Sequence, residues 1–335
     1  MDEIQNISER REPRKVFSRI GLAYFVILVI SILLQYVGMG LVMHYKPELL
    51  DTNWFVMLLS FAPLYIVAVP VGYLLLRKIP AQKPQQEKMG FGQFIVFLIM
   101  CFSIMYIGNI ISTLLNSAFA SMKGTEYDNP IYGILNNSNI FLNIVFVVLL
   151  APIFEELIFR RLLIDRIRQY GEGTAILVSG LMFGLFHGNL YQFFYAFGLG
   201  AMFAYIYLRT GRVRYTIFLH VIINFFGGIL STLIVEGVDL EALSNMDTTN
   251  IEEVARFAEE NLTQMVGFGL YIIAIIALFI AGLILLIVKR KDAVLRPTDM
   301  QLEKGTLFRT VFLNAGMFLF ILLTLGLMTY TVFAI

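Results

Sequence analysis

The chain has 335 residues, of which 58% are hydrophobic and 15% are charged, and its mean hydropathy is +0.77. This apolar share exceeds the ~45–50% of an ordinary soluble domain, so the composition predicts an all-α, polytopic membrane protein and excludes a single soluble globular domain. The formal net charge of +1 gives no indication of a nucleic-acid partner, and the single cysteine, Cys101, excludes an intramolecular disulfide.

Apolar runs of helical length predict about nine membrane-spanning helices. They cover residues 17–43, 54–76, 91–115, 139–159, 174–189, 190–208, 215–235, 265–288 and 309–333. A basic stretch precedes the first run, which is expected to be a retained anchor rather than a cleaved signal. Four regions follow: an N-terminal membrane region (1–138), a four-span core (139–235), an acidic outer loop (236–264) and a C-terminal membrane region (265–335).

The distribution of basic residues predicts the orientation in the membrane. If the spans alternate from a cytoplasmic N-terminus, all but three of the 25 Lys and Arg residues lie on the cytoplasmic side, the exceptions being Lys46, Lys123 and Arg256. The C-terminus is then outside, and no organelle signal is seen, so we expect a multi-pass protein of a bacterial cell membrane. The outer segment 236–264 carries eight acidic residues against Arg256 alone; it is expected to be a solvated cap or a lid over a site.

The fourth run contains charges that an ordinary spanning helix would not carry. Glu155, Glu156 and Arg160 lie in the stretch "LLAPIFEELIFRRLL", and each charge at the centre of a bilayer costs roughly 2.5–3.5 kcal/mol unless it meets a partner or water. Arg160 follows Glu156 by four residues, so it is either an ion-pair partner or an interface anchor. Pro152 lacks a backbone donor and is expected to bend the helix, leaving carbonyl groups that need another partner.

Two histidines fall in apolar runs at compatible depths. Glu155 and His187 are each 16 residues from Gly171 in the turn "YGEG", which places both about 24 Å from the turn in an antiparallel helix pair. His220 and Asn224 follow the next turn, at Gly211, by 9 and 13 residues and share one helix face. We therefore expect these four side chains to lie together, with Glu155 facing His187.

Glycines repeat every fourth residue on the helix that carries His187. Gly180, Gly184 and Gly188 are predicted to allow close approach of a neighbouring helix, which would fix the position of His187.

These residues resemble a known family. "EELIFR" is similar to the Glu-Glu-x-x-x-Arg motif of the CAAX-protease and bacteriocin-processing (CPBP, or Abi) family of intramembrane proteases. "FGLFH", ending at His187, and "HVIIN", from His220 to Asn224, match its other two motifs in family order. The resemblance covers about residues 140–230.

The resemblance implies an intramembrane endopeptidase that hydrolyses a membrane-anchored protein or peptide in a cavity open to the bilayer. It implies that Glu155 is the general base, that His187 orients the water, and that His220 and Asn224 stabilise the oxyanion. Glu156 and Arg160 complete the candidate site. Members of the family cut prenylated proteins or are linked to bacteriocin processing.

Other interpretations of the same residues remain open. Two histidines and two glutamates could bind zinc, but there is no His-Glu-x-x-His pair on one helix, so no metal or other cofactor is expected. Intramembrane ionisable groups also line proton-coupled transporters, although no internal repeat is found here. A non-catalytic partner that regulates another membrane protein is the third alternative.

Overall fold

The computed structural model describes residues 12–124, 139–236 and 250–333. Within these ranges the chain is helical, and no strand occurs. In the part of the chain that the structure describes, seven helices are long and apolar enough to cross a membrane. Their bounds are Pro13–Tyr45, Asn53–Leu76, Phe91–Lys123, Ile140–Tyr170, Val213–Ile234, Leu262–Asp292 and Ala315–Phe333. The predicted all-α, multi-pass class is confirmed.

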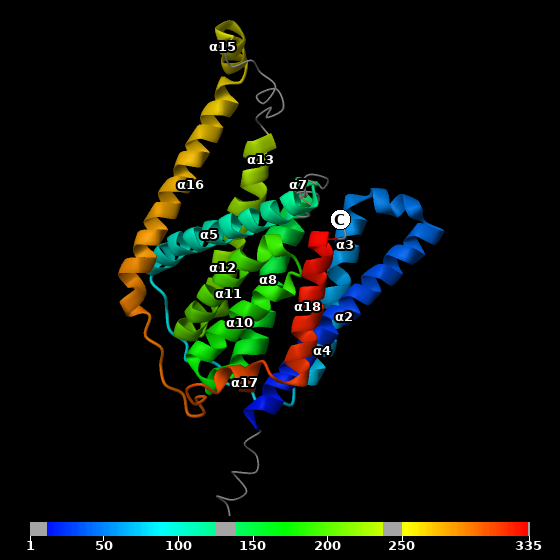
Figure 1. The fold of residues 1–335 in the computed structure, drawn as a ribbon, viewed down its shortest axis with the longest axis vertical. Helices are drawn as coiled ribbons and strands as arrows, with labels where there is room; N and C mark the ends of the chain where they lie inside the picture. Colours follow the sequence, from blue (N-terminus) through cyan, green and yellow to red (C-terminus); the bar gives the residue numbers. More distant parts are fainter. Residues whose placement is uncertain (1–11, 125–138, 237–249, 334–335) are drawn as a thin grey trace, which may run out of the picture.

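The predicted count of nine spans is not confirmed. The fifth and sixth predicted spans correspond to α10 (Glu172–Phe186) and α11 (Leu190–Thr210), and neither is among the seven candidate spans. α10 has 15 residues, fewer than the ~20 that cross a bilayer. Both helices lie in the middle of the bundle, where α5 (Phe91–Lys123) packs along α11 (Figure 1).

Three spanning helices are built from segments of different helical geometry. The second span joins α3 (Asn53–Ala62), the π-helical η2 (Pro63–Ala68) and α4 (Val69–Leu76). The fourth runs through six segments: α7 (Ile140–Asn143), η3 (Ile144–Leu150), α8 (Ala151–Glu156), η4 (Leu157–Ile164), α9 (Asp165–Ile167) and η5 (Arg168–Tyr170). The next span after α11 consists of α12 (Val213–Asn224), η6 (Phe225–Leu230) and α13 (Ser231–Glu236).

The helices from α8 to α12 form the centre of the bundle, and the N- and C-terminal spans surround them (Figure 1). α2 (Pro13–Tyr45) and α18 (Ala315–Phe333) come from opposite ends of the chain and pack side by side. The ring of Tyr24 in α2 contacts Phe320 in α18 and Phe159 in η4, with centroids 6.2 and 5.6 Å apart. α2 and α18 are therefore part of one apolar core with the central helices.

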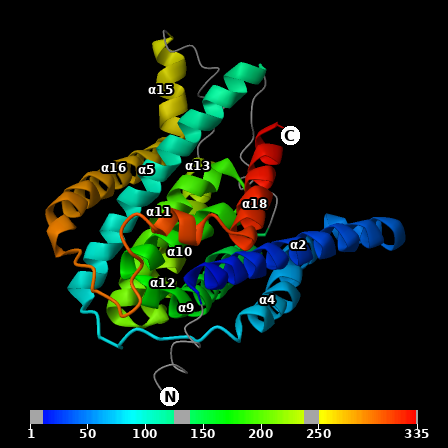
Figure 2. The ribbon, with the colours of Figure 1, turned by 60° about the horizontal axis from the view of Figure 1, so that its bottom comes forward.

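Two connecting segments cross the end of the bundle near the predicted cytoplasmic side (Figure 2). In residues 77–90, the Gln82 and Glu87 amides donate to the carbonyls of Asp165 and Thr210. In residues 293–306, the Leu302 amide donates to the Tyr170 carbonyl. These segments hold the ends of the central helices in place, which limits their movement around the candidate site.

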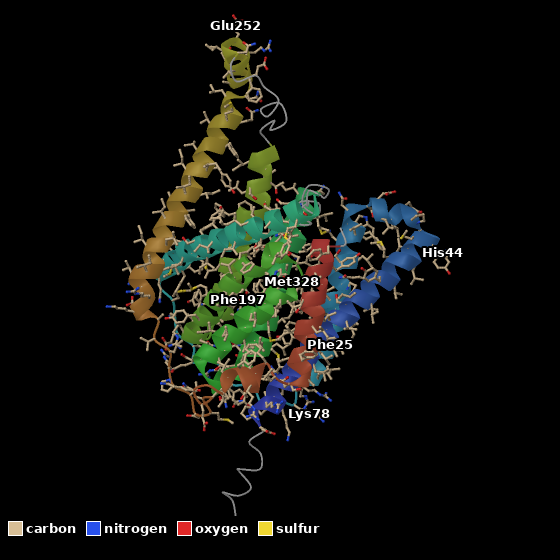
Figure 3. All side chains as sticks on the ribbon, viewed as in Figure 1. Phe25, His44, Lys78, Phe197, Glu252 and Met328 are labelled. Carbon is tan, nitrogen blue, oxygen red and sulfur yellow. The ribbon has the colours of Figure 1, made fainter. Side chains whose placement is uncertain are left out.

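The outer segments differ from the predicted loops. α5 continues to Lys123, beyond the predicted end at residue 115. In the acidic segment, α15 (Ile251–Glu260) is helical and leads into α16 (Leu262–Val288). Glu252 marks this end of the molecule, opposite Lys78 (Figure 3). Residues 125–138 and 237–249, on which the rest of the loop and lid predictions fall, are outside the described residues.

The last span starts at Ala315 because a separate short helix, α17 (Leu307–Val311), precedes it.

Candidate active site

The helix that carries the two glutamates has a discontinuity in its backbone hydrogen bonding at Pro152. In the π-helical segment before it, the Ala151 amide donates to the Phe146 carbonyl, five residues back. With the same spacing of five residues, the Val147 carbonyl would accept from the amide of residue 152. Residue 152 is a proline and has no N–H, so the Val147 carbonyl lacks this backbone partner. Asn224 in α12 supplies one, its side-chain Nδ2 donating to that carbonyl at 3.0 Å. The bond ties α12 to the helix just before Glu155.

Glu156 is the fixed member of the carboxylate pair. Its side chain is fully buried and accepts hydrogen bonds from Arg160 Nε at 2.8 Å and Arg160 Nη2 at 3.2 Å. His220 Nδ1 donates to the same carboxylate at 3.2 Å. Both oxygens of Glu156 are therefore committed to protein partners. The expected pairing of Glu156 with Arg160 is present in the structure.

Arg160 is held on its other side by groups that the sequence did not single out. Its Nη1 donates to the hydroxyl of Ser179 in α10 at 2.5 Å, and that hydroxyl donates to the Phe159 carbonyl at 3.2 Å. The guanidinium also lies over the rings of Phe183 and Phe203, 5.5 and 5.8 Å from their centroids. A buried guanidinium with a carboxylate, a hydroxyl and two aromatic faces is well stabilised away from water.

Glu155 has a different environment from its neighbour. Its side chain retains 16% exposure, and its Oε2 lies 3.6 Å from His220 Nε2. The ring of Tyr65, in η2 of the second span, stacks on Phe154, the residue before Glu155, with centroids 4.6 Å apart. His220 thus lies between the two carboxylates, with Nδ1 bonded to Glu156 and Nε2 directed at Glu155.

His187 lies at the end of α10. Its Nδ1 donates to the Phe183 carbonyl at 2.8 Å, which leaves Nε2 with a lone pair in the neutral ring. The Phe183 ring stands between the two histidines, with centroids 4.9 Å from His187 and 5.7 Å from His220. No ion pair within 4 Å joins Glu155 to His187 among the described residues, and their facing each other stays a prediction. His220 occupies the position beside both glutamates.

The glycines of α10 act as predicted at two of three positions. A Cβ on Gly180 or Gly184 would lie 2.8–2.9 Å from the Phe197 or Phe193 carbonyl of α11, so the two backbones touch. Gly188 lies beyond the helix, has φ of +62° and packs against Leu327 of α18. Its role is to turn the chain after His187.

The structure thus brings Glu155, Glu156, Arg160 and His220 into one cluster and places Asn224 and His187 at its edges. The sequence analysis missed Ser179 and Tyr65. Ser179 could have been predicted from the sequence, because it is a polar residue in an apolar helix. It is eight residues before His187 and so lies on a similar face of the helix. Tyr65 had no such signal, because it lies on a different span, far away in the sequence.

The donor set does not form a metal site in this arrangement. Arg160 and His220 occupy both oxygens of Glu156, which leaves Glu155, one nitrogen of His220 and Nε2 of His187 as possible ligands. Across the part of the chain that the structure describes, no group of three or more His, Cys, Asp and Glu side chains is placed to hold a metal ion.

Comparison with known proteins identifies the segment that carries the cluster. Residues 137–226 match the family model described as type II CAAX prenyl endopeptidase Rce1-like, and all three motifs fall within this range. This segment is a CAAX-protease-family domain. The resemblance inferred from the motifs is confirmed.

A relative of low sequence identity also supports this family. Over 165 residues, the chain is 27% identical to a Bacillus subtilis protein named "Putative membrane peptidase YdiL", and the aligned region is 48% of this chain and 67% of that protein. No solved structure matches the chain significantly. Together, the CAAX-protease-family domain and the relative support a multi-pass membrane protease.

Proposed function

We propose that this protein is an intramembrane endopeptidase of the CAAX-protease type that hydrolyses a peptide bond of a membrane-anchored protein or peptide with water activated at Glu155. The observation that supports this most directly is the contrast between the two carboxylates. Glu156 is fully buried with both oxygens bonded, whereas Glu155 is partly exposed and faces an imidazole nitrogen. A general base must reach both solvent and substrate, which selects Glu155.

In the proposed reaction, Glu155 takes a proton from water as the water oxygen attacks the peptide carbonyl carbon. The carbonyl π bond breaks and a tetrahedral oxyanion forms. When the C–N bond breaks, the protonated Glu155 returns its proton to the leaving nitrogen. The carboxylate therefore serves as base and then as acid, and the net consumption is one water for each bond cleaved.

His220 is proposed to stabilise the oxyanion. Its Nδ1 donates to Glu156, which orients the ring, and in the protonated ring Nε2, the nitrogen that lies 3.6 Å from Glu155, carries the second N–H, which donates to the oxyanion. Glu156 and Arg160 are positioning residues in this scheme, because they act through His220. Asn224 has two N–H groups on its amide and commits one to Val147; the other is available to the substrate.

His187 is assigned to the attacking water. Its Nδ1 bond to the Phe183 carbonyl leaves Nε2 as an acceptor, so this nitrogen is able to orient a water molecule near Glu155. The site lies in helices that span the membrane, which favours a substrate that is itself bound to the membrane. The positive charges favour a protein with a cytoplasmic N-terminus and an outer C-terminus, in a bacterial cell membrane.

The proposed function is tested by comparing the termini of membrane proteins, by mass spectrometry, in cells that carry the wild type or Glu155→Gln at equal expression. We expect new N- or C-termini in the wild type that are absent from the variant. Purified wild type should then cut a peptide spanning such a site in liposomes. The absence of any terminus that depends on Glu155 would contradict the proposal.

A further inference from the structure

A groove of about 470 Å³ lies between the second and fourth spans and is not part of the carboxylate cluster. Its walls come from η2 and α4 on one side and from α8, η4 and α9 on the other. Most of the lining side chains are apolar or aromatic, among them Val69, Phe154 and Leu157. Leu157 and Tyr73 are 40% and 51% exposed, so the groove is open along helices that face the bilayer.

Two arginines line the part of the groove nearest the turn at Gly171. Arg161 and Arg166 are five residues apart, and most of the chain between them is π-helical, the geometry in which residues i and i+5 share a face. This region is close to the predicted cytoplasmic side, where most basic residues of the chain gather.

Neither arginine has a carboxylate oxygen within 4 Å among the described residues, although Asp165 is near enough to interact with both through its charge. Arg166 donates from Nε and Nη1 to the carbonyls of Leu76 and Leu162, and Arg161 makes a long bond of 3.4 Å to the Tyr207 hydroxyl. Asp165 lies between them in sequence, but its carboxylate accepts from Tyr207 and is not within 4 Å of either guanidinium. Two cations in an apolar groove therefore retain donors for an anion.

We infer that this groove binds an anionic phospholipid, whose phosphate contacts Arg161 and Arg166 and whose acyl chain lies along the apolar wall towards Phe154. The charge pattern supports this occupant, because basic pockets between spanning helices on the cytoplasmic side bind acidic headgroups. The volume falls within the ~300–1,000 Å³ of small-molecule sites. A zwitterionic lipid would place its own cation against the two arginines.

The groove also reaches the candidate active site. Tyr65 lines it and stacks on Phe154, the residue before Glu155 in α8, with centroids 4.6 Å apart. A bound acyl chain would therefore lie against two aromatic rings beside the helical segment that carries the partly exposed carboxylate. The lipid site is independent of the reaction chemistry, so its test does not require a substrate.

The test measures binding to purified full-length protein in detergent by thermal unfolding during lipid titration. Phosphatidylglycerol and phosphatidylcholine with identical acyl chains are compared with glycerol phosphate alone. We expect tighter binding of phosphatidylglycerol. Each lost arginine–phosphate contact is worth about 1 kcal/mol, so Arg161→Gln should weaken binding about fivefold.

Arg161→Lys keeps the charge and should retain the lipid preference. Arg168→Gln is the matched control, because Arg168 donates to the Lys83 carbonyl and does not line the groove. Arg161 is preferred to Arg166 as the first variant, since Arg166 also holds two backbone carbonyls.

Four results would overturn the inference. Equal affinity for the two lipids, or an unchanged preference in Arg161→Gln, would show that the arginines do not recognise a lipid phosphate. Equal stabilisation by glycerol phosphate alone would identify a soluble anion as the ligand. Displacement of phosphatidylglycerol by an apolar peptide with a free C-terminal carboxylate, but not by its amide, would assign the groove to a protein chain.

Discussion

Replacing each glutamate of the pair by glutamine should separate catalysis from stability. Glutamine keeps the size and hydrogen-bonding capacity of glutamate but carries no charge. In the proposed mechanism, both substitutions reduce activity. Only one should also reduce stability, because the two carboxylates have different partners in the structure.

Glu156→Gln removes the counter-ion of a guanidinium that is fully buried. Arg160 would then retain a neutral amide oxygen, Ser179 and the two aromatic faces as partners, but no counter-ion. Breaking a buried ion pair by removing one partner costs roughly 3–5 kcal/mol. We therefore expect a clear fall in the unfolding temperature, together with lower activity because His220 loses the carboxylate that orients it.

Glu155→Gln should behave in the opposite way. Among the described residues, no arginine or lysine pairs with Glu155, and an intramembrane carboxylate costs roughly 2.5–3.5 kcal/mol. Removing this charge should leave stability unchanged or higher, as expected where a functional residue is retained at the expense of stability. Turnover should fall by at least the ~10²–10⁴ that general-base catalysis supplies.

The assay combines a melting curve for each purified variant with cleavage of a membrane substrate in liposomes. The double variant Glu156→Gln/Arg160→Gln is the control, because removing both charges should recover part of the stability lost in Glu156→Gln. Wild-type cleavage by Glu155→Gln would refute the assigned base. Equal destabilisation by the two single substitutions would show that the carboxylates do not have separate roles.

Three further predictions address Asn224, metal dependence and topology. Asn224→Ala leaves the Val147 carbonyl without a donor, so it should destabilise the protein by about 1–3 kcal/mol and also reduce turnover; an unchanged melting curve would contradict the role of that bond. Strong chelators should leave the purified enzyme active, and chelator inactivation that zinc reverses would show that a metal is required. Cysteines introduced at Glu252 and Lys291, both exposed, should be labelled from outside and from the cytoplasm respectively, since the native Cys101 is buried; the reverse pattern would invert the proposed topology.

Several features of the fold and site could be predicted from local chemistry in the sequence. The two turns at Gly171 and Gly211 are present, with φ of +115° and +59°, because only glycine adopts such backbone angles at little cost. Pro152 has the predicted consequence, since the missing N–H leaves a carbonyl that Asn224 satisfies. The Glu156–Arg160 pair follows from a spacing of four residues.

The tertiary structure alone decided which histidine meets the glutamates. Counting residues from a turn gives depth along a helix, and it placed Glu155 and His187 correctly on neighbouring helices. The residue count does not give the direction in which a side chain points around the helix axis. π-Helical segments on both sides of α8 change the angle between successive side chains. The contacts of His220 with both glutamates therefore come from the tertiary structure. Ser179, Tyr65 and the arginine-lined groove depend on contacts between distant spans, which one sequence does not encode as a local pattern.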